Sequence, residues 1–530
     1  MASLLRRVCN GALAPYRDAY RNLSVAPREL HVLFAIALLT TFGIAGTSSV
    51  LVLYLSAEFG FSDVEAANVM AASTVTYIVF GFFTGRVIDR VGIVHSLVIG
   101  GVLGVLGSVL TSVAVDRWLV VFAVCVVLSL TMTFVTPVIS IGIKRFTFRQ
   151  NRLTAFMAVY VVLNVGAALS YLYVDFVRRR FTHPLHVALY GEFSATSSRI
   201  IIMTSAMSTI GASVLAACGM RNVMVDRKGF VAPYTPKTNV TSVEAAEIDR
   251  ANAHCWRMIL EPNFRRLAVF SFIMFWLLKM FSHFDVTFPK AAVRELGDDA
   301  LFGTLKAINP LTIIVFQLPI SYAFRNVDIV TVLIAGSAVA GLATFGFVLP
   351  ASYTSWALSY EAFTVGEMIF SHRVNEFAIN LMPPDREGTY STLVGIYMIL
   401  PRFVADAFGG WLLSAYCPAD GARHCAVMWS VIAIMNNVTW VLLWVCARYL
   451  RAGLPDELRS VAGVDGEDDT DATELGRFTI DNDDATSEAA YRDMLLRYTQ
   501  ERAARGLPVA EGEDVRHEID DMLMRHPDKK

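Results

Sequence analysis

Charged side chains are scarce in this chain of 530 residues: Asp, Glu, Lys and Arg together make up only 17% of it. Soluble proteins carry about 25% charged residues. Hydrophobic residues, by contrast, account for 55% of the sequence. The shortage of charge therefore excludes an ordinary soluble protein and indicates an integral membrane protein.

Motifs of enzymes, metal proteins and nucleic-acid-binding proteins are also missing. The seven cysteines are scattered, without the CxxC spacing of metal ligands, so we expect no metal site. The net charge of −2 comes with no basic patch interleaved with aromatic residues, which argues against a nucleic-acid partner. A glycine-rich phosphate-binding loop with its lysine is absent, which argues against ATP-driven transport. The sequence therefore predicts neither an enzyme nor a bound cofactor.

Only one pair of cysteines lies close together in a loop. Cys417 and Cys425 fall in a polar segment between two hydrophobic runs. A disulfide is expected if that loop faces an oxidising compartment, and two free thiols are the equal alternative.

Long hydrophobic runs dominate the rest of the chain. A helix that spans a bilayer needs about 20 mainly apolar residues. On that criterion we predict an all-α integral membrane protein with twelve transmembrane helices in two six-helix bundles. The predicted spans are 30–55, 66–86, 95–115, 118–141, 153–176, 199–219, 265–289, 302–324, 328–349, 354–379, 389–415 and 425–448.

These spans divide the chain into five parts. They are an N-terminal segment 1–28, a first bundle 29–219, a polar linker 220–264, a second bundle 265–450 and an acidic tail 451–530. We expect most of the tail to be disordered because its composition cannot bury a core. A helix over 488–505 is predicted within it, and the tail is a candidate region for binding a cytosolic partner.

Basic residues gather in alternate loops, which predicts the orientation. By the positive-inside rule both termini, the linker and the tail are cytoplasmic. Arg178, Arg179 and Arg180 break this rule, because they fall on the opposite side. We expect a multi-pass protein of the plasma membrane, with an intracellular organelle membrane as the alternative.

A short motif stands between the second and third predicted spans. It reads Gly85-Arg86-Val87-Ile88-Asp89-Arg90-Val91-Gly92. A glycine permits a tight turn, while the Asp89 carboxylate and the Arg90 guanidinium are able to latch neighbouring helix ends. With six-plus-six helices and a long central loop, this motif resembles the major facilitator superfamily. The resemblance implies the major facilitator fold and assigns Asp89 and Arg90 to gating.

Further short segments resemble the proton-dependent oligopeptide transporter family, the peptide transporter branch of that superfamily. They are Tyr160-Val161-Val162-Leu163-Asn164-Val165-Gly166, then Asn309-Pro310, and then Gly366-Glu367 with Ser371. The matches are separated by divergent sequence and together span roughly residues 40–415. This resemblance implies a peptide-like substrate and proton coupling.

The first bundle departs from that family at its charged positions. Where the family has Glu-x-x-Glu-Arg in its first helix, this chain has residues 37–41, Ala-Leu-Leu-Thr-Thr. A further arginine is replaced by Ser48, and a lysine by Thr136. A zwitterionic peptide would lose its expected partners there, and burying it unpaired is costly.

The candidate substrate-binding residues are mostly neutral polar groups at mid-membrane depth. The amides can instead bond neighbouring helices, and the aromatic residues can simply pack. These candidates are Tyr77, Tyr160, Asn164, Trp276, Asn309, Glu367 and Ser371.

Two titratable residues are the candidates for proton coupling. Glu367 is an acid inside an apolar span, where a charge persists only beside protein or water. His283 titrates near neutral pH and shares a helix face with Lys279. The competing interpretation, which we favour slightly, is that 283–290 is the outer, wetter end of its helix.

Arg402 and Asp406 lie one helical turn apart in the eleventh predicted span. We expect a local ion pair between them, with a role in gating.

Together these features predict a secondary active transporter that moves a small polar organic solute by alternating access. A peptide-like solute is the first choice, and coupling to protons would run through Glu367. A uniporter or symporter for a neutral solute such as a sugar is the first alternative, because the first bundle has lost its charges. A non-transporting receptor or scaffold with a transporter fold is the second alternative.

Overall fold

The structure is a computed structural model that describes residues 23, 26–147, 152–186, 194–225, 231–233, 261–324, 327–381 and 387–454. The predicted tail helix 488–505 and most of the linker lie outside these residues.

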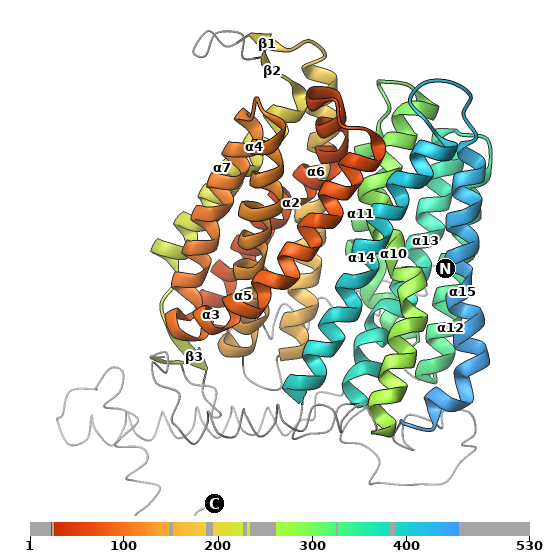
Figure 1. The fold of residues 1–530 in the computed structure, drawn as a ribbon. Helices are drawn as coiled ribbons and strands as arrows, with labels where there is room; N and C mark the ends of the chain where they lie inside the picture. The colour runs from red at the N-terminus through yellow and green to blue at the C-terminus, as the bar shows by residue number, and fades with distance from the viewer. Residues whose placement is uncertain are drawn as a thin grey trace, which may run out of the picture. The chain divides into compact units, whose positions relative to one another are not determined.

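Among the described residues, seven helical elements precede the linker (Figure 1). They are α2 (Arg28–Phe59), α3 (Asp63–Val113), α4 (Arg117–Phe122), the π-helical η1 (Ala123–Leu128), α5 (Ser129–Phe146), α6 (Arg152–Arg180) and α7 (Ser197–Gly219). Helix α3 contains both the second and the third predicted spans, which meet at Gly92. The φ of 80° at Gly92 interrupts the helix at a position where only glycine is free of strain.

Seven helical elements follow the linker. They are α10 (Pro262–Leu296), α11 (Phe302–Ala323), α12 (Ile329–Ala343), the 3₁₀-helical η3 (Thr344–Val348), α13 (Tyr353–Asn380), α14 (Glu387–Tyr416) and α15 (Cys425–Arg451). Every predicted span therefore falls on helix, with boundaries that differ by a few residues.

Two small antiparallel hairpins interrupt the helical pattern and were not predicted. Strands β1 (Leu185–His186) and β2 (Ser194–Ala195) pair between α6 and α7, and β3 (Val223–Val225) pairs with β4 (Val231–Pro233). The second hairpin lies in the segment that we expected to be a polar loop. Strands of two or three residues are too short to leave an alternating pattern in the sequence.

Local signals explain where some helices begin and end. Helix α3 starts at a capping box in which Ser62 accepts from the amide of Glu65 and the Glu65 carboxylate accepts from the amide of Ser62. Helix α2 ends at Gly60, whose left-handed backbone (φ 64°) closes the last turn. Together they form the short turn between α2 and α3.

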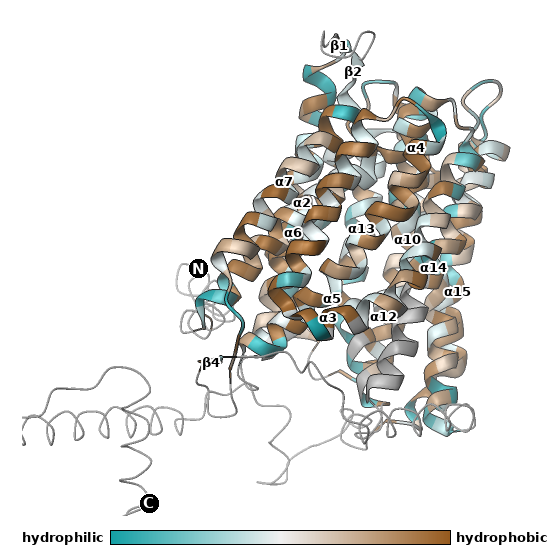
Figure 2. Ribbon diagram, turned by 60° about the vertical axis from the view of Figure 1, so that its left-hand side comes forward, coloured by the Kyte–Doolittle hydropathy of each residue, from teal (hydrophilic) through white to brown (hydrophobic). Residues whose placement is uncertain are grey.

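Hydrophobic residues cover the middle of the helices, and hydrophilic residues collect toward the ends (Figure 2). Large apolar side chains stay exposed on the outside, among them Phe83, Phe176, Trp118 and Trp444. Such exposure is unfavourable in water and suits a lipid surface. Ten helices in the described ranges are long and apolar enough to cross a membrane.

The predicted spans 354–379 and 389–415 lie on α13 and α14, which are not among those ten helices. Helix α13 carries four charged side chains, Glu361, Glu367, Arg373 and Glu376. The number twelve and the cytoplasmic termini stay predictions.

The helices before the linker pack mainly on one another, as do those after it. Helix α2 packs on α6 and α7, and α3 on α5 and α7, whereas α10 packs on α14 and α15, and α12 on α13 and α15. Among the described helices, the main contacts that join the groups are those of α3 with α14, of α6 with α11 and of α2 with α10. We call these the first and the second helix group below.

Two glycines let α12 and α13 approach closely. A Cβ atom on Gly366 would lie 2.4 Å from the backbone nitrogen of Ala340, and one on Gly336 would lie 2.8 Å from that of Phe370. Small residues at such crossings allow backbone contact between membrane helices. The crossing fixes the position of Glu367, the next residue on α13.

We predict that Gly366→Ala destabilises the protein by about 1–3 kcal/mol, because the added methyl group forces the two backbones apart. The measurement is the thermal unfolding midpoint of the purified protein in detergent. Gly81→Ala is the matched control, since a Cβ atom there meets nothing within 4 Å. Equal midpoints for the two variants would contradict the close crossing.

Candidate functional site

A cavity of about 140 Å³ lies among α6, α10, α11 and α13, and so between the two helix groups. Its lining combines aromatic rings with one lysine, one aspartate and one amide. The lining residues are Tyr171, Phe281, Phe284, Asp285, Lys306, Asn309 and Tyr360. Apolar walls with a few convergent polar groups are typical of small-molecule sites.

The charged centre of the cavity is Lys306 on α11, which is 1% exposed. Its Nζ lies 2.7 Å from Asp285 Oδ1 on α10 and donates to Ser49 Oγ on α2 at 3.1 Å. The ammonium also lies 4.7 Å from the centre of the Tyr171 ring on α6. Nη2 of Arg402 on α14 lies 3.5 Å from the other oxygen of Asp285. These partners offset the cost of burying a cation.

A neutral amide holds the acid Glu367 at the edge of the cavity. The Nδ2 atom of Asn309 on α11 donates to Glu367 Oε2 at 2.6 Å and lies 3.1 Å from Thr364 Oγ1. Glu367 is 6% exposed and has no salt bridge to another described residue. The predicted residues Asn309 and Glu367 are therefore brought together.

Three further predicted residues lie near Glu367. The hydroxyl of Tyr160 on α6 interacts with the side chains of Asn164 and Ser371. Asn164 also donates to the Tyr160 carbonyl at 2.8 Å, a bond within α6. Tyr160 meets the ring of His372 edge-on, at 5.7 Å between centres. This cluster joins α6 of the first group to α13 of the second.

Tyr77 and Trp276 are not among the residues that line this cavity. Tyr77 is half-buried on α3. Trp276 on α10 packs edge-on against Phe272 and Phe275, and the ammonium of Lys279 lies 5.3 Å from its ring centre. For Trp276 the geometry favours packing over substrate stacking.

His283 lies in the interior, which corrects the interpretation of this segment as an outer, wetter helix end. His283 is 0% exposed and Lys279 is 1% exposed. The Nδ1 atom of His283 lies 3.0 Å from the Thr287 hydroxyl on the same helix. Helix α10 continues to Leu296, so residues 283–290 are followed by almost two further turns.

The expected local pair of Arg402 and Asp406 is also corrected. Arg402 reaches Asp285 on α10, and Asp406 accepts a hydrogen bond from Ser282 on the same helix. Both side chains of α14 therefore bind partners on α10. They do not bind each other, although they lie one turn apart on the same helix.

The gating motif is only partly described. The side chain of Asp89 lies outside the described part of the chain, and Arg90 is exposed. Gly85 is helical, so the turn of the motif is made at Gly92.

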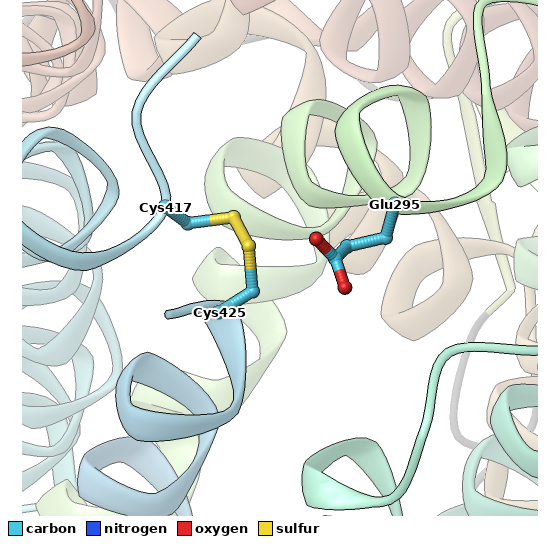
Figure 3. A group of neighbouring side chains, drawn as sticks. All are labelled: Glu295, Cys417 and Cys425. Carbon is cyan, nitrogen blue, oxygen red and sulfur yellow. A yellow bond between two sulfur atoms is a disulfide. The ribbon is translucent and has the colours of Figure 1, made fainter. Parts of the chain in front are cut away.

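The structure contains a disulfide between Cys417 and Cys425, with 4.6 Å between their Cα atoms. Figure 3 shows the carboxylate of Glu295 beside it. Because the sulfurs are bonded to each other, neither is a free thiolate that could bind a metal ion. We call the end of the molecule at which these cysteines lie the disulfide end.

An ion-pair cluster joins the two helix groups at the disulfide end. Asp63 Oδ1 at the start of α3 lies 2.8 Å from Lys290 Nζ and 2.7 Å from Arg294 Nη2, both on α10. Lys290 also donates to Ser56 Oγ on α2 at 2.6 Å, and Arg294 donates to the Cys417 carbonyl. We call this cluster the Asp63 lock.

A second contact at this end joins α6 to the start of α11. Asp175 accepts hydrogen bonds from the amides of Gly303 and Thr304, which satisfies free donors at the α11 N-terminus. Arg178, one turn further, donates to the carbonyls of Ala300 and Asp298. Arg178, one of the three arginines that break the positive-inside rule, therefore binds the backbone of the second helix group.

The sequence model of the Major Facilitator Superfamily matches residues 33–405. The chain belongs to this superfamily. It is a multi-pass membrane transporter and not an enzyme.

Relatives of this facilitator are distant in sequence. An uncharacterized MFS-type transporter, YqjV of Bacillus subtilis (strain 168), is 21% identical over 416 residues, which are 77% of this chain and 91% of that protein. A POT family transporter in complex with 5-aminolevulinic acid superposes with a TM-score of 0.61 at 16% identity, covering 80% of this chain and 97% of that one.

The peptide transporter POT, solved as a mutant in complex with alafosfalin, gives the same TM-score of 0.61 at 17% identity, with 81% and 96% covered. These likenesses bear out the resemblance to peptide transporters in fold.

In a facilitator, a contact between the helix groups at one end closes that end. The Asp63 lock joins the groups at the disulfide end, and so do the hydrogen bonds from Gly303 and Thr304 to Asp175, which we call the Asp175 cap. We therefore interpret the disulfide end as the closed end of the cavity around Lys306.

Sequence reasoning passed over several site residues. Lys306 is a lysine within an otherwise apolar span, and that alone marks a functional candidate. Tyr171, Tyr360 and Asp175 carry no such signal, because tyrosines and acids near helix ends are common. Only the packing of α11 against α6 and α13 shows where they lie.

We predict that Asp63→Asn opens the disulfide end, because Lys290 and Arg294 lose their buried counter-ion and become hydrated on opening. Breaking a buried pair costs about 3–5 kcal/mol, so the opening constant should rise at least about a hundredfold. The measurement is hydrogen exchange at the amides of Gly303 and Thr304, which the Asp175 carboxylate protects across the helix groups.

Glu65→Gln is the matched control for this variant. It also neutralises an acid at the disulfide end, but Glu65 pairs with Arg117 within the first helix group, at 3.3 Å and half exposed. Unchanged exchange in Asp63→Asn would show that the lock does not hold this end closed.

Proposed function

We propose that this facilitator is a secondary active transporter for a small polar solute with an anionic group, with peptide-like solutes as the first choice. The observation that carries the proposal is the buried Lys306 in the cavity between the helix groups. Transport would proceed by alternating access, with the solute bound between the groups.

The anionic group of the solute would bind at Lys306. The ammonium is paired with Asp285 in the present state, and Arg402 approaches the same carboxylate. A carboxylate from the solute has the same charge and size as that of Asp285, so it can replace Asp285 on Lys306. The charges lost from the first bundle thus have counterparts in the second.

The other end of the solute would bind near Glu367. Asn309 lines the cavity together with Lys306 and donates to Glu367. A carboxylate beside the cavity suits an amino group of the solute, whose charge would complete the pairing. A solute with both groups fits this arrangement better than a sugar, which needs no counter-ion.

Relatives of the same fold support an acidic or peptide-like solute. One solved POT family transporter holds 5-aminolevulinic acid, another a thioalcohol-conjugated peptide, and the peptide transporter POT holds sulfate. The cavity of about 140 Å³ is smaller than the ~300–1,000 Å³ typical of ligand pockets, which favours a small member of this class.

We predict that replacing Lys306 with Met, together with Asp285→Asn to avoid an unpaired acid, weakens binding of acidic solutes by about tenfold to a hundredfold. Hydrogen bonds to charged groups contribute about 1.5–3 kcal/mol. The measurement is a thermal-shift screen of the purified protein with dipeptides, amino acids and sugars. Lys306→Arg, which keeps the charge, is the control.

The outcomes of this screen separate the candidate substrates. A stabilising sugar whose effect survives the double substitution would establish the neutral solute instead. An acidic solute that binds both proteins equally would show that Lys306 does not hold it.

Proton coupling would run through Glu367, whose carboxylate is bound to a neutral amide and is therefore free to change its charge. We predict that Glu367→Gln abolishes accumulation driven by a proton gradient in proteoliposomes, while solute exchange at equal pH persists. Uptake in the unmodified protein that ignores an imposed proton gradient would establish a uniporter. Ligand binding without any flux would establish a receptor.

We place the termini and the acidic tail in the cytoplasm, and the protein in the plasma membrane. The disulfide supports this orientation, because such bonds persist on the oxidising side of a membrane. Labelling of Lys529 and Lys530 in the tail by an impermeant reagent, in sealed cells and in broken ones, tests this orientation.

A further inference from the structure

Three buried titratable side chains lie outside the cavity, on the facing helices α10 and α14. Lys279, His283 and Asp406 are each at most 1% exposed. Each also has one polar atom without a hydrogen-bond partner: Lys279 Nζ, His283 Nε2 and Asp406 Oδ2. Such groups are rare inside membrane proteins, because a buried charge without a partner is costly.

Asp406 has hydroxyl neighbours and no cation at salt-bridge distance among the described residues. Its Oδ1 accepts from Ser282 on α10, and the Thr74 hydroxyl of α3 lies beside it. The charged groups that face it are Arg402 on its own helix and Asp285 on α10. The salt bridge of Arg402 goes to Asp285, and none to Asp406 is found among the described residues.

His283 and Lys279 are the other two buried titratable residues of this set, and both lie on α10. They lie one turn apart on one face of α10, next to Ser282. A Cβ atom on Gly409 of α14 would lie 3.2 Å from His283 Nδ1, so the two helices touch there. From α3, the described neighbour of Asp406 is the Thr74 hydroxyl, which carries no charge.

Asp406 also lies where the two helix groups meet. Gly410, one turn further along α14, packs on α3, because a Cβ atom there would lie 2.4 Å from Ala67 Cβ. The same stretch of α3 begins at Asp63, the centre of the lock. A movement that separates α3 from α14 therefore acts on the surroundings of Asp406 and on the lock together.

We propose that Asp406 is a proton-binding site, separate from the substrate cavity, whose bound proton favours closure of the disulfide end. In the closed state the proton joins a carboxylate oxygen and forms a neutral acid, which has no buried charge to compensate. Opening separates α3 from α14, water reaches the group, and the proton leaves to water. The proton is the ligand, and no other reactant is needed.

This proposal depends on the proposed transport function in one respect only, namely that closure of the disulfide end would serve transport. It does not depend on Glu367. The sign of the linkage follows from the binding preference. A proton that binds the closed state better stabilises that state at low pH, and raising the pH opens the end. A single linked proton changes the opening constant by up to about tenfold per pH unit.

The test is hydrogen exchange at the amides of Gly303 and Thr304 in the full-length protein, between pH 5 and pH 9. After correction for the intrinsic exchange rate, we expect opening to increase with pH. In Asp406→Asn, which mimics the neutral acid at almost the same size, we expect low exchange without pH dependence. Ser282→Ala removes the hydroxyl donor and should shift the midpoint of the profile.

Two control variants make the result specific. Glu361→Gln removes another acid of the second helix group, one that binds Thr312 at 2.8 Å, and should keep the full pH dependence. Glu367→Gln is the second control, because it shows whether the linked proton binds at the proposed coupling residue instead. If the pH dependence of exchange persists in Asp406→Asn, the proposal is wrong. If the pH dependence is lost only in Glu367→Gln, the proposal is also wrong, but the proposed function stands.

The lock carboxylates cannot imitate the expected result. Protonation of Asp63 or Asp175 weakens their contacts, so these groups would open the disulfide end as the pH falls. Opening that increases toward low pH in the unmodified protein would therefore contradict the site at Asp406.

Discussion

The cost of a charge inside a membrane protein organises this structure. An ion that leaves water must find a counter-ion or a set of hydrogen bonds, and in a helical bundle these partners lie on other helices. Lys306 accordingly meets Asp285 of α10, Ser49 of α2 and the ring of Tyr171 on α6. A single lysine thereby draws together helices from both groups, at the place where a transported solute would bind.

The same principle makes the closed disulfide end reversible. The Asp63 lock and the Asp175 cap consist of hydrogen bonds and ion pairs between the helix groups, and water can replace each of them on opening. Apolar contacts of equal extent would be harder to break, because apolar side chains form no hydrogen bonds with water when the contact opens. Under the proposal above, the buried acid Asp406 would add a dependence on protons to this exchange between partner and solvent.

Much of the fold could be predicted from local sequence. The helices coincide with hydrophobic runs, and the turn at Gly92 falls in a motif that the superfamily shares. Asn309 and Glu367, which a family resemblance made site candidates, are in contact in the structure. The prediction of a local pair between Arg402 and Asp406 was wrong. Spacing along α14 does not show that Asp285 of α10 lies within reach of Arg402. The hairpin β3–β4 was not predicted, because its strands have only three residues each.

The sequence alone determined three things: that this protein is a membrane protein, which segments are helical, and to which superfamily the chain belongs. It could do so because hydropathy, chain length and short motifs are local properties. The tertiary structure decided which charges pair, that Cys417 and Cys425 bond, and that Lys306 rather than Trp276 lines the cavity. These outcomes depend on how helices far apart in the chain pack against one another. Hydrophobic periodicity shows which face of a helix is buried, but it does not show which side chain that face will meet.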